Sequence, residues 1–493
     1  MHLAFLPAKI RPTPSPPTPH SNASEADLLL FTTQPQRIIK RFPEIVFAMS
    51  ETTSTRDLFD RFVVPTYGRF DLRFHRGSGR VVWDENDKRY LDFGSGIAVT
   101  SVGHSHPKIV AAITEQANTL LHVSNLYLSR PQALLAERIV RLMGGHGKVF
   151  FCNSGAEANE ALYKLARKFG NQALGFSDSL PHPVGDPDTT PAPKFTVISM
   201  LNSFHGRTLA GIAATGQEKV RHGFEPLAQG FKNVPFNDLQ SLTETVKNDP
   251  SAAAILTEAI QGESGIRAAS AEFLHGAAQL AKQRNLLLII DEVQAGFGRT
   301  GHWHGWEHTA PDLQPDAVSW AKGLGGGLPI GAVWISDREI TLRSGDRIPL
   351  CDLLGPGSHG TTFGGTPFVS RGALEVLSLI EDENLLENAR IQGQYILSQL
   401  RDLAHPLIKE VRGHGLLVGI ELNADLLGKS LSLPPGKLPA VAVVEKLQDA
   451  GLLTVPSAPA TIRWLPALNV TRDEIDEATQ ITATVLDAIC PRH

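Results

Sequence analysis

Five short apolar runs, together with stretches that have helical spacing, constrain the fold of this chain more than any other feature. The runs are KVFFC, FTVISML, AAILTEAI, NLLLIIDEV and DAVSWAK, and the helical stretches include HPKIVAAITEQANTLL and EANEALYKLARKF. Strands that alternate with helical crossovers form a mainly parallel sheet with helices on both faces. The sequence therefore predicts an α/β fold, and such folds bind their ligands at the carboxyl ends of the strands.

Changes in the pattern of expected helices and strands along the chain predict its domain organisation. The alternating pattern occupies residues 106–370, which we expect to form a large domain that holds the ligand. Residues 371–493 contain long amphipathic helices around two probable strands, LLVGIEL and TIRWLP, and predict a smaller α/β domain. Residues 49–105 are expected to pack with that small domain through the stretch GRVVWDENDKRYLDF.

Two polar segments are expected to lie outside the packed core. Residues 1–48 include RPTPSPPTPH and a Ser/Thr-rich stretch, so they are expected to be disordered. We interpret them as an upstream extension before Met49; a transit peptide is the alternative, and the acidic residues of the segment count against it. Residues 171–193, rich in Pro and Asp, predict an exposed insertion with no catalytic role.

Composition narrows the class of function. With 493 residues, of which 42% are hydrophobic, the chain can bury a large core. Its net charge of -5 comes from interspersed charges, which favours small-molecule partners over nucleic acid or a membrane surface. No apolar run approaches the roughly 20 residues that span a bilayer. Three cysteines without CxxC spacing argue against a disulfide framework and predict a reducing, cytoplasmic location.

A lysine and a carboxylate each follow an apolar run. Asp291 ends the run LLLII, where a carboxylate is costly unless a cation meets it. Lys322 follows AVSWA and precedes a Gly-rich turn, which makes it a candidate nucleophile. A surface lysine is an equally good interpretation of that stretch alone. The turn lacks the GKS or GKT ending of a P-loop.

The stretch FFCNSGAEANEAL predicts a strand followed by a helix that begins near Glu157. Backbone amides of Gly155 and Ala156 at such a helix start offer an anion site. A simple capped helix, with Ser154 as the N-cap, is the alternative. A nucleophilic lysine, an anion site and a buried carboxylate together match pyridoxal phosphate, which needs a Schiff base, a phosphate site and a partner for its ring nitrogen.

One histidine-rich stretch raises a different possibility. GHWHGWEH contains His302, His304 and His308, which could bind a metal. Histidines beside tryptophans are more often packing and hydrogen-bonding residues. We therefore expect no metal site.

Eight motifs in one order identify a resemblance. They are LDFGSGIAVTSVGHSHP, NSGAEANEAL, NSFHGRTLA, EAIQGESG, IIDEVQAGFGRTG, AKGLGGGLPIGA, HGTTFGGTP and VRGHGLLVGIEL. The chain resembles class III, fold type I pyridoxal-phosphate aminotransferases from about residue 60 to its end. The resemblance implies a homodimer with shared sites.

The resemblance assigns cofactor roles to several residues. It gives Lys322 the Schiff base and the proton shift, and Asp291 the ring nitrogen. It implies that Phe204 stacks on one face of the ring, that Val293 packs on the other, and that Gln294 approaches the ring hydroxyl. It gives phosphate contacts to Gly155 and Ala156, and to Thr362 acting in the neighbouring subunit.

Substrate roles also follow from the resemblance. Arg412 in VRGHG matches the arginine for the α-carboxylate, and Arg207 in FHGRT matches the arginine for the distal carboxylate. Glu263 matches the glutamate that can pair with the α-carboxylate arginine. Ile97 stands where enzymes that act on free ornithine have a tyrosine, which disfavours free ornithine.

The branch that acts on N2-acetylornithine is the most similar part of the family. DFGSGIAV and GFEPLAQGFKNVPFNDL carry this likeness. The implied reaction moves the δ-amino group of N2-acetylornithine to 2-oxoglutarate by ping-pong kinetics. Alternatives within the family are 4-aminobutyrate, succinylornithine or succinyldiaminopimelate as the amino donor. A pyridoxal-phosphate aminomutase is an alternative of another reaction class.

Overall fold

The computed structural model describes residues 54–173, 194–457 and 459–492. The chain divides into two units, Met1–Asp71 and Leu72–His493. In the first, helix α1 (Thr55–Phe62) is N-capped by Ser54, whose hydroxyl accepts a hydrogen bond from the amide of Asp57. The predicted disordered segment 1–48 and most of the predicted insertion 171–193 lie outside the described residues.

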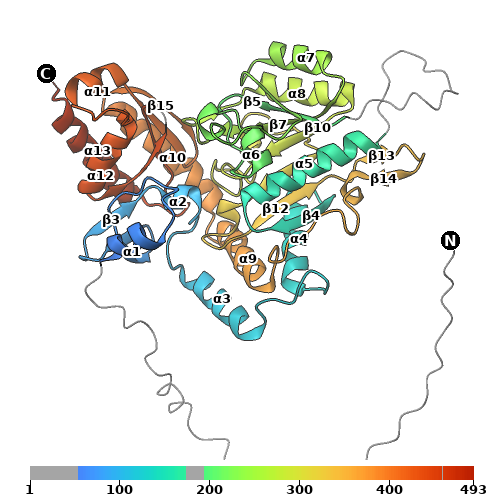
Figure 1. Ribbon diagram of the computed structural model, residues 1–493. Helices are drawn as coiled ribbons and strands as arrows, with labels where there is room; N and C mark the ends of the chain where they lie inside the picture. Colours follow the sequence, from blue (N-terminus) through green and yellow to red (C-terminus); the bar gives the residue numbers. More distant parts are fainter. Residues whose placement is uncertain (1–53, 174–193, 458, 493) are drawn as a thin grey trace, which may run out of the picture. The chain divides into compact units, whose positions relative to one another are not determined.

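A seven-stranded sheet forms the centre of the second unit (Figure 1). Its strands lie in the order β4-β12-β11-β10-β7-β5-β6, and the pairs β11/β10, β10/β7, β7/β5 and β5/β6 are parallel. The bounds are β4 (Lys148–Cys152), β12 (Gly331–Ile335), β11 (Ala317–Trp320), β10 (Leu287–Asp291), β7 (Ala252–Glu258), β5 (Thr196–Met200) and β6 (Phe231–Val234). The predicted α/β fold with a mainly parallel sheet is confirmed.

The strands near the centre of the sheet are buried along their whole length. Every residue of β7, β10 and β11 is buried, as expected for parallel strands covered on both faces. Because β7, β10 and β11 run in the same direction, Glu258, Asp291 and Ser319 lie side by side near their carboxyl ends. The fold therefore brings polar side chains to one edge of an otherwise apolar sheet.

Helices cover this sheet. Helix α5 (Gly155–Gln172) packs along β12, β11 and β7, and nine of its residues are buried. Helix α8 (Ala271–Arg284) packs against β10 and β7, and α7 (Leu239–Asn248) against β6 and α8. The remaining helices before the C-terminal region are α2 (Ser95–Ala98), α3 (Pro107–Thr119), α4 (Arg130–Leu142) and α6 (Leu209–Ala214).

The C-terminal region carries a second sheet. It has the antiparallel order β15-β16-β19-β18, with β15 (Ile408–His414), β16 (Leu417–Leu422), β19 (Thr461–Trp464) and β18 (Val455–Ser457). The helices of this region are α9 (Pro367–Asp382), α10 (Leu385–Asp402), α11 (Ala424–Ser430), α12 (Pro439–Asp449) and α13 (Arg472–Ile489). The predicted strands LLVGIEL and TIRWLP correspond to β16 and β19.

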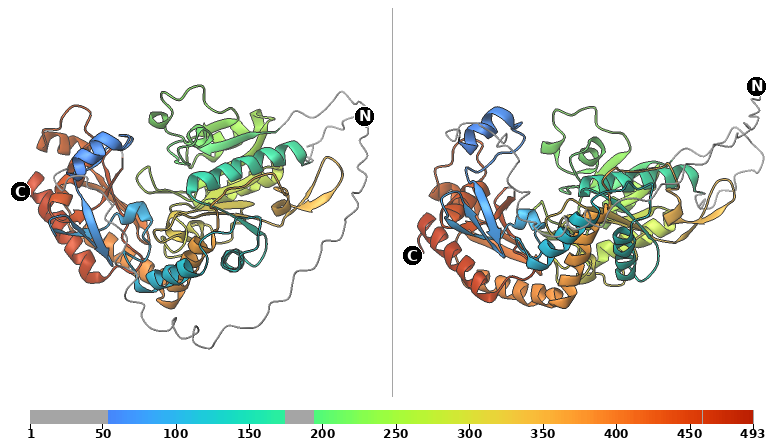
Figure 2. Two further views of the ribbon diagram at one scale, coloured as in Figure 1. Left: turned by 60° about the horizontal axis from the view of Figure 1, so that its bottom comes forward. Right: turned by 90° about the horizontal axis from the view of Figure 1, so that it is seen from below.

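Chain segments far apart in sequence share a third sheet, of order β1-β2-β3-β17. Strands β1 (Phe74–Ser78), β2 (Val81–Asp84) and β3 (Arg89–Asp92) join β17 (Leu452–Leu453), which pairs in parallel with β3. In both views of Figure 2 these blue strands lie beside the red C-terminal elements.

Short strands complete the fold: β8 (Ile260–Gln261), β9 (Arg267–Ala268), β13 (Glu339–Thr341) and β14 (Arg347–Pro349). No helix among the described residues is long and apolar enough to cross a membrane.

Candidate active site

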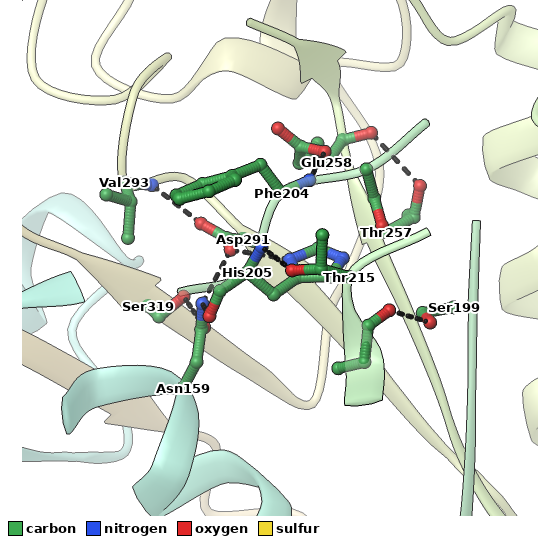
Figure 3. A network of polar contacts seen from close by, with 12 residues as sticks. Asn159, Ser199, Phe204, His205, Thr215, Thr257, Glu258, Asp291, Val293 and Ser319 are labelled. Carbon is green, nitrogen blue, oxygen red and sulfur yellow. Dashed lines mark hydrogen bonds and ion pairs between the residues drawn. The ribbon is translucent and has the colours of Figure 1, made fainter. Parts of the chain in front are cut away.

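The carboxylate of Asp291, at the end of β10, is held by three hydrogen bonds (Figure 3). Its Oδ2 accepts from Asn159 Nδ2 at 2.7 Å and lies 2.8 Å from Nδ1 of His205. Its Oδ1 accepts from the backbone amide of Val293 at 3.0 Å. Asp291 is 4% exposed, so the carboxylate is fixed in a nearly dry environment.

Further hydrogen bonds fix Asn159 and His205, the two side chains that contact Oδ2 of Asp291. Ser319 Oγ on β11 donates to Asn159 Oδ1 at 2.8 Å, and Asn159 Nδ2 also donates to the carbonyl oxygen of His205 at 3.1 Å. The amide of His205 donates to Oγ1 of Thr215 at 2.8 Å. Sequence reasoning missed both Asn159 and His205. The detectable signal was Asn159, an amide on the otherwise apolar buried face of α5.

A second buried carboxyl group lies next to Asp291. Glu258, at the end of β7, pairs in register with Asp291, and its Oε2 accepts from the amide of Phe204 at 3.2 Å. Burial, and then the negative charge of Asp291, raise the pKa of Glu258 well above its usual value. The site therefore contains a carboxyl group whose environment favours its neutral form.

Lys322 follows β11 and lies at the same edge of the sheet. Its backbone is in the left-handed region, with φ of 41°, and Ser101 Oγ donates to the carbonyl oxygen of the next residue, Gly323, at 2.9 Å. Burial, and then the positive charge of Arg463, lower the pKa of Lys322 to about 8. Deprotonated amines are nucleophiles, so the site prepares Lys322 for covalent chemistry near neutral pH.

The predicted anion site begins α5. Ser154 caps the helix by accepting a hydrogen bond from the amide of Glu157 at 3.2 Å, so this part of the simple capped-helix reading holds. A Cβ on Gly155 would lie 2.7 Å from the side chain of Val293, and a Cβ on Gly206 would lie 3.0 Å from that of Ala156. The helix start is thus pressed against the segments that follow Asp291 and Phe204.

Gln294 supplies an unpaired polar atom. Its Oε1 is buried and has no hydrogen-bond partner among the described residues. A Cβ on Gly262 would lie 1.7 Å from this oxygen, which shows how closely Gln294 lies against the backbone there. A buried acceptor without a donor is costly, and a ligand hydroxyl would satisfy it. This atom, the amine of Lys322 and the helix start together fit pyridoxal phosphate.

A buried ion pair differs from the predicted one. Arg463 on β19 is 1% exposed, and its Nη1 lies 2.9 Å from Glu263 Oε2. Its Nη1 also donates to the carbonyl oxygen of Gly262 at 3.0 Å. The predicted partner of Glu263 was Arg412, so that pairing is wrong. The signal for Arg463 was an arginine inside the apolar strand TIRW, because arginine is almost never fully buried unless paired.

Arg412 on β15 has other partners. Its Nη1 donates to Glu410 at 2.6 Å and to Glu421 at 2.7 Å, and its Nε donates to the carbonyl oxygen of Gly265 at 2.8 Å. It lines a groove of about 1350 Å³ that Glu263 also lines, whereas neither Lys322 nor Asp291 contributes to it. The VRGHG motif therefore places its arginine in a network with the exposed Glu410 and the half-buried Glu421.

The other predicted substrate residues lie at the periphery. Arg207 is exposed, and its guanidinium lies 5.5 Å from the centroid of the Phe204 ring. Ile97 is 41% exposed and has φ of 68° within α2, where Ser95, Gly96 and Ala98 also have positive φ. A β-branched residue in this region is strained, and such strain clusters at functional sites.

Thr362 lies on an exposed loop. His122 Nε2 is 2.9 Å from its carbonyl oxygen, and Asn125 Nδ2 donates to the carbonyl oxygen of Gly364 at 3.0 Å. No contact of Thr362 with Lys322 or Asp291 is present in the described part of the chain. The predicted phosphate role of Thr362 therefore depends on a second subunit.

Two remaining features of the sequence have structural roles. Glu292 is 1% exposed, accepts a hydrogen bond from the amide of Gly305 at 2.6 Å, and has its pKa raised to about 8 by burial. His304 stacks on Trp306 with ring centroids 4.4 Å apart. His304 thus packs against a tryptophan, as predicted for histidines beside tryptophans.

Sequence comparison shows relatives along most of the chain. The model of the family described as aminotransferase class III matches residues 63–486. The chain is 42% identical to the acetylornithine aminotransferase of Thermosynechococcus vestitus over 86% of this chain and 94% of that protein. It is 40% identical to that of Methanocaldococcus jannaschii, over 85% of this chain and 94% of the relative.

Solved structures agree with the sequence comparison. An ornithine aminotransferase from Toxoplasma gondii superposes with a TM-score of 0.76 at 30% identity, covering 89% of this chain and 96% of that one. An acetylornithine aminotransferase from Elizabethkingia anophelis gives a TM-score of 0.70 at 31% identity, covering 87% and 97%. Fold, family match and relatives agree, and the chain belongs to the class III aminotransferases.

Proposed function

We propose that the protein is an N2-acetylornithine:2-oxoglutarate 5-aminotransferase that uses pyridoxal 5'-phosphate. Relatives named acetylornithine aminotransferase, at 40 to 42% identity, support this donor over free ornithine. A cytoplasmic location fits the three free cysteines.

The residues around Asp291 fit the cofactor. When bound, pyridoxal phosphate supplies an aldehyde for the amino group and a ring that accepts electrons from the reacting carbon. Asp291 would hold a proton on the ring nitrogen, and Phe204 and Val293 would enclose the ring. Gln294 Oε1 would accept from the ring hydroxyl, and the amides of Gly155 and Ala156 would face the phosphate. Lys322 would carry the proton between substrate carbon and cofactor.

One observation carries the choice of substrates: the Arg463–Glu263 pair lies close enough to Lys322 to perturb its pKa. The reacting carbon of 2-oxoglutarate bears a carboxylate, which would pair with Arg463 after displacing Glu263. The reacting carbon of N2-acetylornithine bears none, so Glu263 can stay on Arg463. A single site thereby accepts both molecules without leaving a buried cation unpaired.

The other end of either substrate also carries a carboxylate. Arg207 is exposed beside Phe204 and would bind that distal group. Ile97 presents an apolar side chain where a polar one would favour the free α-amine of ornithine. An acylated amine is less polar, which agrees with an isoleucine at this position.

An exposed apolar segment supports the proposal of a homodimer. Leu126, Tyr127 and Leu128 are largely exposed, as is Phe363, and Asn125 joins this segment to the loop that carries Thr362. Exposed apolar surfaces of this kind mark interfaces. We propose that a second copy covers this surface and that Thr362 reaches the phosphate in the partner's site.

The proposed donor can be tested by single-turnover spectroscopy of the cofactor-loaded protein. We expect N2-acetylornithine alone to convert the visible absorbance of the aldehyde form into the near-ultraviolet absorbance of the amine form. Added 2-oxoglutarate should restore the first spectrum, because the two half-reactions of a ping-pong enzyme are separable. Conversion by 4-aminobutyrate and not by acetylornithine would keep the family and reject this donor.

The role of Arg463 predicts a selective effect on one substrate. We expect Arg463→Gln to raise the KM for 2-oxoglutarate about 100-fold, because a desolvated charge pair is lost. The KM for N2-acetylornithine should change less than about threefold, since that donor places no carboxylate there.

Arg412→Gln is the matched control for this prediction. Arg412 is bound to Glu410 and Glu421, and neither Lys322 nor Asp291 is among its partners, so both KM values should stay within about threefold of the parent values. Steady-state kinetics with each substrate varied in turn measures all four constants. A selective rise of the KM for 2-oxoglutarate in the Arg412 variant would instead show that Arg412 binds the carboxylate, as the sequence suggested.

A further inference from the structure

A second buried arginine lies on the segment that follows Asp291. Arg299 is 2% exposed, and burial alone lowers its pKa to about 10. No carboxylate lies within ion-pair distance of it in the described part of the chain. Its Nη2 is buried without a hydrogen-bond partner. Burying a cation without a counter-charge costs free energy, so a buried arginine at this position suggests a specific role.

The only acceptors of the Arg299 guanidinium among the described residues are main-chain carbonyls. Its Nη1 donates to the carbonyl oxygen of Leu416, at 3.3 Å, and to that of Pro466. Leu416 immediately precedes β16, and Pro466 follows β19 by two residues. These strands are antiparallel neighbours, so both carbonyls lie at the same end of one ladder.

That ladder carries Arg463. Within it, Gly419 of β16 pairs with Arg463 of β19, and Val418 pairs with Trp464. Arg299 therefore binds this strand pair at Pro466, three residues beyond Arg463. At its other end, the segment from Asp291 to Arg299 contains Val293 and Gln294, which we propose contact the cofactor. One side chain thus joins the cofactor segment to the strand that carries the carboxylate arginine.

We propose that Arg299 is a positioning residue that sets where Arg463 stands relative to Lys322 and Asp291. This inference rests on the proposed role of Arg463 in binding the carboxylate of 2-oxoglutarate. Both bonds come from Nη1, whose two N–H groups are fixed in the plane of the guanidinium, whereas the N–H groups of a lysine ammonium rotate freely on a flexible stem. Loss of the guanidinium would let the end of β19 shift, and a carboxylate site tolerates little displacement.

The main chain provides a reason to expect folded variants. The amide of Leu416 donates to the carbonyl oxygen of Arg299 at 2.9 Å, and a side-chain substitution leaves this bond in place. Arg299→Met keeps the length of the buried side chain and removes its charge. Arg299→Lys keeps the charge and loses the planar donor group. Arg401→Met removes an arginine–carbonyl bond at Val411 of β15 in the same sheet, away from β19, and serves as the control.

The test measures the affinity for succinate, an unreactive dicarboxylate, by calorimetry on the cofactor-loaded protein, and the KM for each substrate. Arg299→Met should weaken succinate binding and raise the KM for 2-oxoglutarate about 10-fold, and Arg299→Lys about threefold. The KM for N2-acetylornithine and kcat should change less than about twofold, as should every constant of Arg401→Met.

A double-mutant cycle separates positioning from general support of the fold. If Arg299 acts through Arg463, adding Arg299→Met to Arg463→Gln should weaken succinate binding less than about twofold further. Additive losses, or equal losses for both substrates, would overturn the inference while leaving the proposed reaction intact. Unchanged succinate binding in Arg463→Gln alone would overturn the carboxylate assignment and this inference together.

Discussion

Replacing Lys322 with alanine should lower kcat by at least about 10⁴-fold, because one residue serves both as nucleophile and as proton carrier. The structure supports both roles. The amine lies at the carboxyl end of the sheet, and burial and Arg463 lower its pKa to about 8. Single-turnover absorbance with N2-acetylornithine measures the loss directly.

The same amine predicts the pH dependence of cofactor capture. Only the neutral amine attacks an aldehyde, and the neutral fraction rises as the pH rises through the pKa. The rate at which apoenzyme captures pyridoxal phosphate should therefore rise with pH and level off above about 8, where an ordinary lysine of pKa 10.5 would still be gaining. A rate that continues to rise to pH 10 would contradict the lowered pKa.

Lys194 provides the control for both measurements. It is partly buried, and burial, followed by Arg284, lowers its pKa, but it lies just before β5, at the opposite end of that strand from the candidate site. Lys194→Ala should leave kcat within about twofold of the parent. If Lys322→Ala kept its activity and Lys194→Ala lost it, the assignment of Lys322 as the nucleophile would be wrong.

The fold was predictable where short-range pattern determines structure. Apolar runs bounded by helical stretches identified β4, β5, β7, β10 and β11; the last four are buried along their whole length, and β4 is buried at its carboxyl end. Strand β12, whose PIGAVWI sequence follows a Gly-rich turn, was not predicted. Its antiparallel pairing with β4 and β11 depends on contacts between distant segments, which periodicity does not encode.

The candidate site was predictable to a similar extent. Asp291 ends β10 and Lys322 follows β11, the parallel neighbour of β10, so their approach follows from topology. Arg463 was missed because its partner, Glu263, is 200 residues away in sequence and the motif VRGHG offered a closer match to expectation. The physical signal for Arg463 was a charged residue inside an apolar strand. This signal is stronger than the motif match, because a buried charge is costly unless a partner of opposite charge lies beside it.

Asp291→Asn should lower kcat about 10³-fold, comparable to the removal of a preorganised charge from other active sites. The amide can no longer hold a proton on the cofactor's ring nitrogen as an anion would. It also conflicts with its neighbours. Asn159 and His205 converge on one oxygen and the amide of Val293 on the other, so an NH2 group at either position meets a donor. Stability should fall by about 1–3 kcal/mol from the unsatisfied donors.

Asp316→Asn separates lost chemistry from lost stability. Asp316 precedes β11 at the opposite edge of the sheet, accepts from the amide of Leu288 at 2.8 Å and pairs with Arg338 at 2.9 Å. Its substitution should also cost about 1–3 kcal/mol, measured by urea unfolding, while kcat stays within about twofold. Two variants with equal losses of stability would then differ about 10³-fold in rate. If both lose rate in proportion to stability, the carboxylate of Asp291 supports the fold and its charge is not what the reaction uses.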